Sequence, residues 1–147
     1  MTLQIRKAEP EDAESIQQLY SQLVSDANVC VSPDQLAALK HDGYNHVFVA
    51  LSNAKMVATA FLTICRDVMY GDQPFAVLEN IVVDRDSRRQ GAGFELMDFI
   101  KSFSKENRCT KIMLLSSSKR TEAHSFFEKC GYQGDLKRAF VNYVNRG

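Results

Sequence analysis

A strand that runs through a glycine-bearing turn into a long helix most limits the folds open to this chain. The run Phe75–Val83 is apolar except for Glu79 and Asn80, and a polar turn with two glycines follows it. Beyond the turn, apolar residues recur at helical spacing: Leu96, Phe99, Ile100 and Phe103. A strand joined to an amphipathic helix needs a sheet whose face the helix can cover. The segment therefore predicts an α/β architecture.

The remaining segments extend this pattern over the whole chain. In order, we expect a strand at Leu3–Ile5, helices opening at Pro10 and after Ser32, a hairpin of Val47–Leu51 with Met56–Ile64, the strand Phe75–Val83, the long helix, a strand at Ile112–Leu115, a helix at Thr121–Lys129 and a last strand at Ala139–Val144. No repeat or linker interrupts the order. We expect one domain over residues 1–147, with helices on both faces of a mixed sheet.

Charge and cysteine content exclude several classes of function. Lys plus Arg and Asp plus Glu number 18 each, so no basic excess points to nucleic acid. The four cysteines form no C-x-x-C pair, and the three histidines add no ligand cluster, so we expect no metal. No apolar run is long enough for a signal segment or a membrane span. We therefore expect a cytoplasmic protein without a membrane partner.

The turn Arg88–Gly93 has the composition of a phosphate site. It opens a helix, and helix N-termini present unpaired N–H groups and the positive end of a dipole. Glycines let a phosphate approach the backbone, and Arg88 and Arg89 add charge. A plain loop with two solvated arginines is the alternative. The P-loop is excluded because Phe94 stands where Lys would be needed, and the dinucleotide fingerprint because it requires three glycines.

Three segments carry a resemblance to one family. Arg88-x-x-Gly91-x-Gly93 resembles the acetyl-CoA motif R/Q-x-x-G-x-G/A of the GNAT superfamily of N-acetyltransferases. Ala123–Tyr132 resembles the second family signature, A-x-x-F-Y-E-K-x-G-F/Y, and Ile5–Asp12 looks like the usual family start. The resemblance implies a mixed, mostly antiparallel sheet of six or seven strands flanked by four helices, with acetyl-CoA as co-substrate.

The resemblance also assigns roles to individual residues. It implies that the Ile81 N–H points at the thioester oxygen, where charge develops during attack by an amine. It implies that the Val83 backbone pairs with the pantetheine arm. The cofactor-binding residues that we expect are Ile81, Val82, Val83, Arg88, Arg89, Gln90, Gly91, Ala92, Gly93, Ser117, Arg120 and Phe127. For Ser117, with Ser118, a plain loop is an equal alternative, and Arg120 could instead be solvated.

Glu79 is the candidate general base. An amine with a pKa near 10 arrives protonated and must lose a proton before it attacks. Glu79 is the acidic side chain of an otherwise apolar strand, where partial burial would raise its pKa. A solvated or salt-bridged residue is the alternative. Asn80 is expected to face the opposite side of the strand, and His124, His41 and His46 are expected to be structural.

Phe127 departs from the family pattern. The family usually has Tyr there to protonate the leaving thiolate, which Phe cannot do. Thiols with a pKa near 8.5 also leave as thiolates, so catalysis is compatible with Phe. The other candidate donors are water, Ser125, Cys130 and Tyr132.

The function that these residues favour is acetyl transfer to a primary amine of a small molecule, by direct attack in a ternary complex. The alternatives are acetylation of proteins or peptides and a non-catalytic acyl-CoA-binding module, which Phe127 makes conceivable. The first two helices are expected to supply the acceptor pocket, through Tyr20, Asp26 and Asn28. The Leu78–Asn80 strand resembles that of glucosamine-phosphate acetyltransferases. Neither the acceptor nor a homodimer follows from the sequence.

Overall fold

The computed structural model describes residues 3–145. The chain divides into two compact units, residues 1–114 and 115–147. No helix among residues 3–145 is long and apolar enough to cross a membrane.

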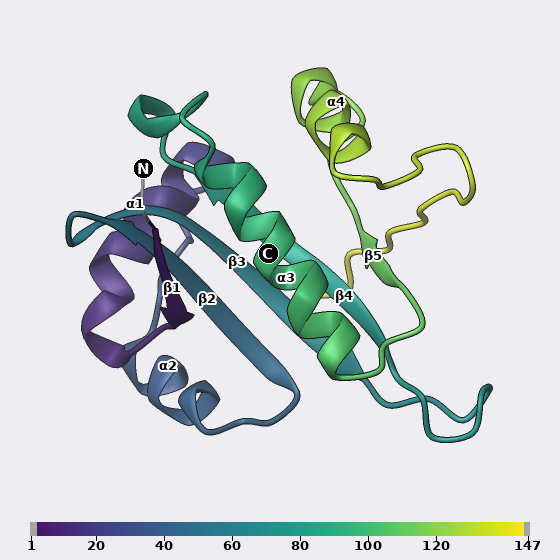
Figure 1. Cartoon of the computed structure of the whole chain (residues 1–147). Helices are drawn as coiled ribbons and strands as arrows, with labels where there is room; N and C mark the ends of the chain where they lie inside the picture. The colour runs from purple at the N-terminus through teal and green to yellow at the C-terminus, as the bar shows by residue number, and fades with distance from the viewer. Residues whose placement is uncertain (1–2, 146–147) are drawn as a thin grey trace. The chain divides into compact units, whose positions relative to one another are not determined.

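The first unit is built on a five-stranded sheet (Figure 1). Its strands are β1 (Gln4–Lys7), β2 (Asn45–Ser52), β3 (Lys55–Cys65), β4 (Phe75–Val83) and β5 (Ile112–Leu114). They lie in the order of the sequence. The first four strands are antiparallel, and β5 pairs with β4 in parallel. The expected strands in this unit are confirmed, but the resemblance implied six or seven strands, and that expectation is wrong.

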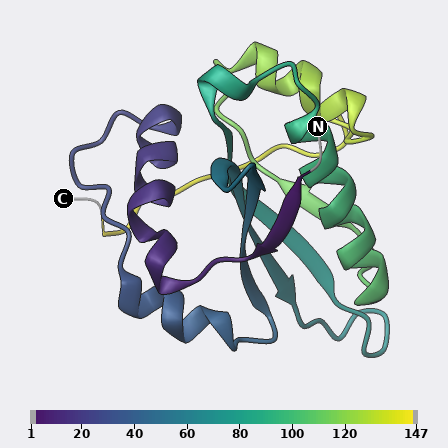
Figure 2. The same ribbon diagram turned by 60° about the vertical axis from the view of Figure 1, so that its left-hand side comes forward.

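Helices cover both faces of this sheet (Figure 2). They are α1 (Ala13–Leu23), α2 (Pro33–Lys40) and α3 (Ala92–Glu106). Successive residues of β2 point to opposite faces. Val47 therefore packs in a core with Leu36 of α2, whereas the Phe48 ring meets the ring of Phe99 from α3 with centroids 5.1 Å apart. The prediction of helices on both faces is confirmed.

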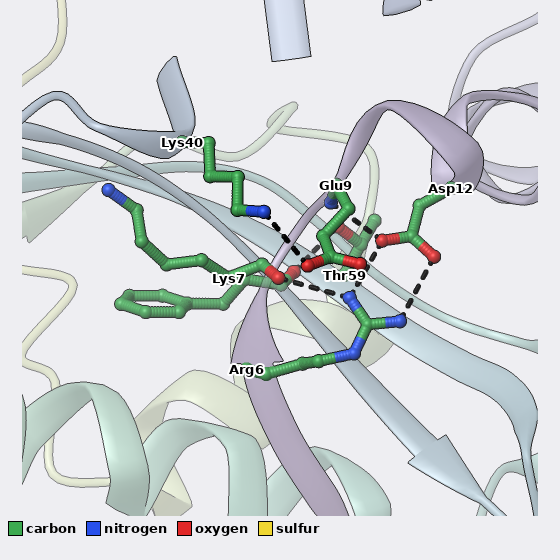
Figure 3. Close-up of polar contacts among 7 residues, drawn as sticks. Arg6, Lys7, Glu9, Asp12, Lys40 and Thr59 are labelled. Atoms are coloured by element: carbon green, nitrogen blue, oxygen red, sulfur yellow. Dashed lines mark hydrogen bonds and ion pairs between the residues drawn. The ribbon is translucent and has the colours of Figure 1, made fainter. Parts of the chain in front are cut away.

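A polar corner fixes the entry of the chain into α1 (Figure 3). The Arg6 guanidinium donates two hydrogen bonds to the Asp12 carboxylate, at 2.7 and 3.1 Å. The Glu9 N–H donates to the same carboxylate at 2.7 Å, and the Asp12 N–H donates back to the Glu9 carbonyl at 2.9 Å. Lys40 of α2 pairs with the Glu9 carboxylate at 3.1 Å. These contacts set the position of α1 relative to β1.

Replacing Asp12 by asparagine is expected to lower the free energy of unfolding by about 1–2 kcal/mol at pH 7, because charge-assisted bonds are lost. Burial alone would raise the pKa of Asp12, but the bonds from Arg6 and the Glu9 N–H outweigh it and lower the pKa. The carboxylate therefore stabilises the fold above its unfolded pKa of about 3.9, and this contribution is lost as the pH falls through the lower folded value. Urea unfolding at pH 7 and pH 3 measures both effects.

The matched control for this substitution is Glu14→Gln, a change of the same kind at an exposed position of α1. It should leave the free energy of unfolding nearly unchanged at both pH values. Equal destabilisation by the two variants would contradict the role given to the Arg6–Asp12 pair.

Within residues 115–145, the second unit contains one helix, α4 (Thr121–Lys129), as predicted, followed by turns and irregular structure. The expected strand Ala139–Val144 is wrong, since no strand is formed within residues 115–145. Phe140 and Val144 of this segment are 85% and 80% exposed. Alternation of apolar and polar residues produces a strand only where a neighbouring strand offers hydrogen-bonding partners, and residues 115–145 contain none.

Candidate active site

A β-bulge interrupts β4 at Asn80 and Ile81. Thr59 of β3 pairs with Val82 and Phe61 pairs with Glu79, so one residue of β3 lies opposite two of β4. Asn80 has φ 54°, in the left-handed region that non-glycine residues seldom adopt. A bulge of this kind bends a strand and re-aims its side chains, and bulges are frequent beside active sites.

The bulge overturns one expectation and qualifies another. Asn80 lines the cavity beside α1 and α2, so the prediction that it faces away from the Glu79 side is wrong. Glu79 and Phe61 are cross-strand partners, which places both side chains on the face that α1 and α2 cover. The partial burial expected for Glu79 is not found, because its side chain is exposed.

Beyond the bulge, one edge of β4 has no neighbouring strand. The pairing with β5 joins only Ala76–Leu78 of β4 to Ile112–Leu114. Residues 79–83 therefore present one backbone edge without a strand partner in the part of the chain that the structure describes. Such an edge can accept an extended molecule as an additional strand.

The segment after β4 leads to the N-terminus of α3. A short 3-10 turn spans Arg85–Ser87, and Gly91 is the N-cap residue with φ 88°. No side chain caps α3, and its first hydrogen bond runs from the Glu95 N–H to the Gly91 carbonyl at 3.0 Å. The geometry of an α-helix leaves the N–H groups of Ala92 and Gly93 without intrahelical acceptors. This end of α3 can therefore bind an anion through its backbone.

Both arginines of the turn are exposed, and each has a distinct conformation. Arg88 is extended, and its Nε donates to the Val83 carbonyl at 3.2 Å. Arg89 has φ 64°, which a side chain of its kind rarely adopts. The contact with Val83 holds one guanidinium beside the last residue of β4, so positive charge lies next to the unpaired edge.

Gln22 of α1 anchors the start of this turn. Its Nε2 donates to Asp84 at 3.0 Å, and its Oε1 accepts from the Arg85 N–H at 2.8 Å. Lys55 lies 3.4 Å from the second oxygen of Asp84. The bond from Gln22, aided by the Lys55 charge, lowers the pKa of the buried Asp84. We call Gln22, Lys55 and Asp84 the loop anchor.

A cavity of about 460 Å³ lies between α1, α2 and the sheet. Its lining residues are Tyr20, Cys30, Val31, Ser32, Gln35, Leu36, Leu39, Asn45, Val47, Phe61 and Asn80. Tyr20 and Asn80 share a side-chain hydrogen bond, and burial raises the pKa of the Tyr20 phenol, which stays protonated at neutral pH. Of the three predicted acceptor residues, Tyr20 lines this cavity, whereas Asp26 and Asn28 do not.

In the second unit, the predicted cofactor-binding residues Ser117 and Arg120 lie just before α4. The Ser117 carbonyl accepts from the Arg120 N–H at 3.0 Å and lies 2.8 Å from His124 Nε2. His124 therefore has a structural contact, in line with the expectation for it. Ser117, Ser118 and Arg120 are all exposed.

Phe127 is the buried aromatic of α4. Its ring lies 5.5 Å from that of Phe126 and 6.5 Å from that of Tyr132. Burial raises the pKa of Tyr132 to about 12. A phenol that holds its proton so tightly is poorly matched to a thiolate whose conjugate thiol has a pKa near 8.5. Tyr132 is therefore a weaker donor candidate than the sequence suggested.

His46 packs among aromatic side chains of the first unit. His46 is buried and stacks on Phe48, with an edge contact to Phe103 and a 3.1 Å contact from Nε2 to the Gly43 carbonyl. Within residues 3–145, no group of three or more His, Cys, Asp and Glu side chains could hold a metal ion.

Comparison with known proteins gives one family. A model of the acetyltransferase (GNAT) family matches residues 12–132. The rice protein (Oryza sativa subsp. japonica) named "Probable glucosamine 6-phosphate N-acetyltransferase 2" is 28% identical over 142 residues, which covers 89% of this chain and 82% of the rice protein.

Solved structures agree on the fold. A protein from Agrobacterium tumefaciens described as an acetyltransferase has a TM-score of 0.85 and 28% identity, over 95% of this chain and 99% of that one. An aminoglycoside acetyltransferase from an uncultured soil metagenomic sample has a TM-score of 0.83 and 21% identity, over 98% of this chain and 97% of its own. At that identity the second likeness concerns the fold alone.

Proposed function

The chain belongs to the acetyltransferase (GNAT) family, and we propose that it transfers the acetyl group of acetyl-CoA to a primary amine of a small molecule. The observation that carries the proposal is the continuity of three features along residues 80–93. The bulge, the unpaired edge of β4 and the uncapped N-terminus of α3 follow one another directly. In this order they could bind the thioester, the extended pantetheine arm and the pyrophosphate of acetyl-CoA.

The backbone of residues 90–93 is the proposed pyrophosphate site. The N–H groups at the start of α3 and the positive end of its dipole favour a bound anion. Gly91 and Gly93 keep side chains away from the approaching oxygens, and Arg88 and Arg89 add charge from the turn.

The unpaired edge of β4 is the proposed site of the pantetheine arm. The arm carries two amide groups, which an unpaired strand can bind as a further strand would. Val82 and Val83 pair with β3 on their other edge, which keeps this segment extended. The Arg88 bond to the Val83 carbonyl would have to give way if the arm bonds there.

The bulge sets the proposed site of chemistry. Neither Asn80 nor Ile81 has a Cα partner on β3 or β5 within the part of the chain that the structure describes. The Ile81 N–H can therefore donate to the thioester oxygen as it gains negative charge. The amine nitrogen attacks the carbonyl carbon, the C–S bond breaks, and CoA leaves as the thiolate. Glu79 takes the proton that the amine loses, directly or through a water molecule.

No side chain is assigned to protonate the leaving thiolate. Phe127 has no proton to donate, and the pKa of about 12 for Tyr132 argues against that hydroxyl. Solvent protonation is sufficient because the thiolate is a stable leaving group at neutral pH. The rice relative, which is named for N-acetylation of glucosamine 6-phosphate, makes small amines the first acceptors to test.

A screen of amines and peptides with acetyl-CoA, which reads released thiol, tests the proposal. Release that depends on a small amine, with an acetylated product in the mass spectrum, supports it. Faster release with peptides would favour the protein-acetylating alternative. Tight binding of acetyl-CoA without release for any acceptor would leave a non-catalytic binding module.

The loop anchor gives a separate prediction. Replacing Gln22 by leucine keeps the side-chain volume but removes the bonds to Asp84 and the Arg85 N–H. The turn that leads to residues 90–93 loses its support, so we expect the Kd for acetyl-CoA to rise about tenfold, which corresponds to the net contribution of about one hydrogen bond. Calorimetry measures the change. Gln18→Leu, on the same helix at an exposed position, is the control, and equal affinities in both folded variants would contradict the role of the anchor.

A further inference from the structure

The cavity beside the bulge is lined by uncharged side chains. Among residues 3–145, none of the side chains that line it is a carboxylate, an ammonium or a guanidinium. Val31, Leu36, Leu39, Val47 and Phe61 form its apolar part. A cavity of about 460 Å³ with an apolar lining and a few polar groups is typical of a site for a small organic molecule.

The polar groups of this cavity are neutral, and several already have partners. Asn45 donates from Nδ2 to Asp42 and accepts from Thr63 at its Oδ1, each at 3.1 Å. Ser32 accepts from the Gln35 N–H as the N-cap of α2. The Gln35 side-chain amide and the Tyr20–Asn80 pair remain, and these can bind a hydroxyl, carbonyl or ether group.

The cations beside the cavity are also paired. Lys7 donates from Nζ to the carbonyls of Leu39 and Asp42, at 3.1 and 2.9 Å. Lys40, which follows Leu39 in the sequence, forms the ion pair with Glu9 shown in Figure 3. The pocket is open to solvent, so a phosphate there would lose part of its water and would find no cation free of other bonds among these two, which makes it less favourable than an uncharged group.

Polycationic acceptors meet the opposite difficulty. Each ammonium group that leaves water needs a carboxylate or several acceptors in exchange. The one carboxylate that the β3–β4 register places on the cavity's face of the sheet beside Phe61 is Glu79, and the proposed reaction uses it for the reacting nitrogen. One amino group of the acceptor therefore has a carboxylate partner, whereas a second or third amino group has none on this face of the sheet among the residues that the structure describes.

We propose that the acceptor is a monoamine whose remaining body is uncharged and partly apolar, and that this body occupies the cavity. This inference rests on the proposed function and goes further, since it separates the chain from relatives named for phosphorylated amino sugars or aminoglycosides. Gln35, exposed at the cavity, then contributes to acceptor specificity.

Matched acceptor pairs test the inference. Tyramine and tyramine O-phosphate, and glucosamine and glucosamine 6-phosphate, differ only in the phosphate, and sisomicin represents the polycations. We expect kcat/KM to be at least about tenfold higher for the member of each pair that lacks the phosphate, and sisomicin to be acetylated more slowly than tyramine. Higher kcat/KM for the phosphorylated members or for sisomicin would overturn the proposal.

Charge changes at Gln35 locate the effect. Gln35→Lys should raise the kcat/KM of tyramine O-phosphate relative to tyramine about tenfold, and Gln35→Glu should lower it, while the KM for acetyl-CoA stays the same. Identical ratios in both folded variants would show that the acceptor does not occupy this cavity.

A failure of the proposed acetyl transfer can be distinguished from a failure of the inference about the acceptor. If no amine releases thiol, the reaction assignment fails, but calorimetric titration of tyramine into the CoA complex still decides the inference. Tyramine binding that weakens in Gln35→Lys would support the cavity as the site for monoamines with an uncharged body, and absence of binding would overturn it.

Discussion

Replacement of Glu79 by glutamine is expected to lower kcat/KM by about 10²–10⁴ at pH 7, which is the usual contribution of a positioned general base. The amide keeps the shape of the side chain but cannot accept the proton that the amine must lose. Because Glu79 is exposed, the substitution should leave the fold intact. Steady-state kinetics with an acceptor found in the amine screen measures the change.

The pH dependence of kcat/KM distinguishes the loss of a general base in Glu79→Gln from a structural disturbance of the site. The deficit should shrink toward pH 10, where the amine is already neutral without assistance. Glu106→Gln, the same chemical change at the exposed end of α3, is the control and should retain full activity. Full activity of Glu79→Gln at pH 7 would show that another group or the solvent takes the proton.

Gly91→Val is expected to weaken acetyl-CoA binding by about ten- to hundredfold for each bond lost, since one or two charge-assisted hydrogen bonds contribute about 1.5–3 kcal/mol each. The isolated chain has open space at this position, with no atom within 4 Å of an added Cβ. The side chain would instead lie where the phosphate must approach. Gly91 also has φ 88°, which disfavours a β-branched residue and would shift the turn.

Gly71→Val separates the phosphate effect from backbone strain. Gly71 also has positive φ, 68°, with open space around its Cβ position, and it lies in the loop between β3 and β4. Both variants should lose similar stability, but only Gly91→Val should lose affinity in calorimetric titration with acetyl-CoA. Unchanged affinity in folded Gly91→Val would contradict the phosphate site.

The fold was predictable where the sequence pattern is local. Phe75–Val83 and Thr121–Lys129 begin and end where the apolar pattern and its flanking turn residues place them. Ser32 caps α2 as its spacing with Gln35 predicts. The turn at Gly91 was likewise predictable, because glycine readily adopts the positive φ that the turn requires.

The bulge in β4 could not be predicted from the sequence. Alternation assigns Glu79 and Asn80 to opposite faces, and only the register of β3 against β4 shows that one residue is extra. The loop anchor depends on a contact over 62 residues, between Gln22 and Asp84, for which no local signal exists. The prediction of a strand at Ala139–Val144 was wrong for a related reason. A strand forms only where a neighbouring strand supplies hydrogen-bonding partners, and the local sequence does not show whether one is present.

The proposal that an amine attacks acetyl-CoA directly, in a ternary complex, is tested by initial velocities over a matrix of acetyl-CoA and amine concentrations. We expect intersecting lines in the reciprocal plots, an acetylated amine in the mass spectrum and no acetylated protein on the reaction path. Parallel lines, together with an acetyl group bound to the protein when acetyl-CoA is supplied alone, would contradict direct transfer.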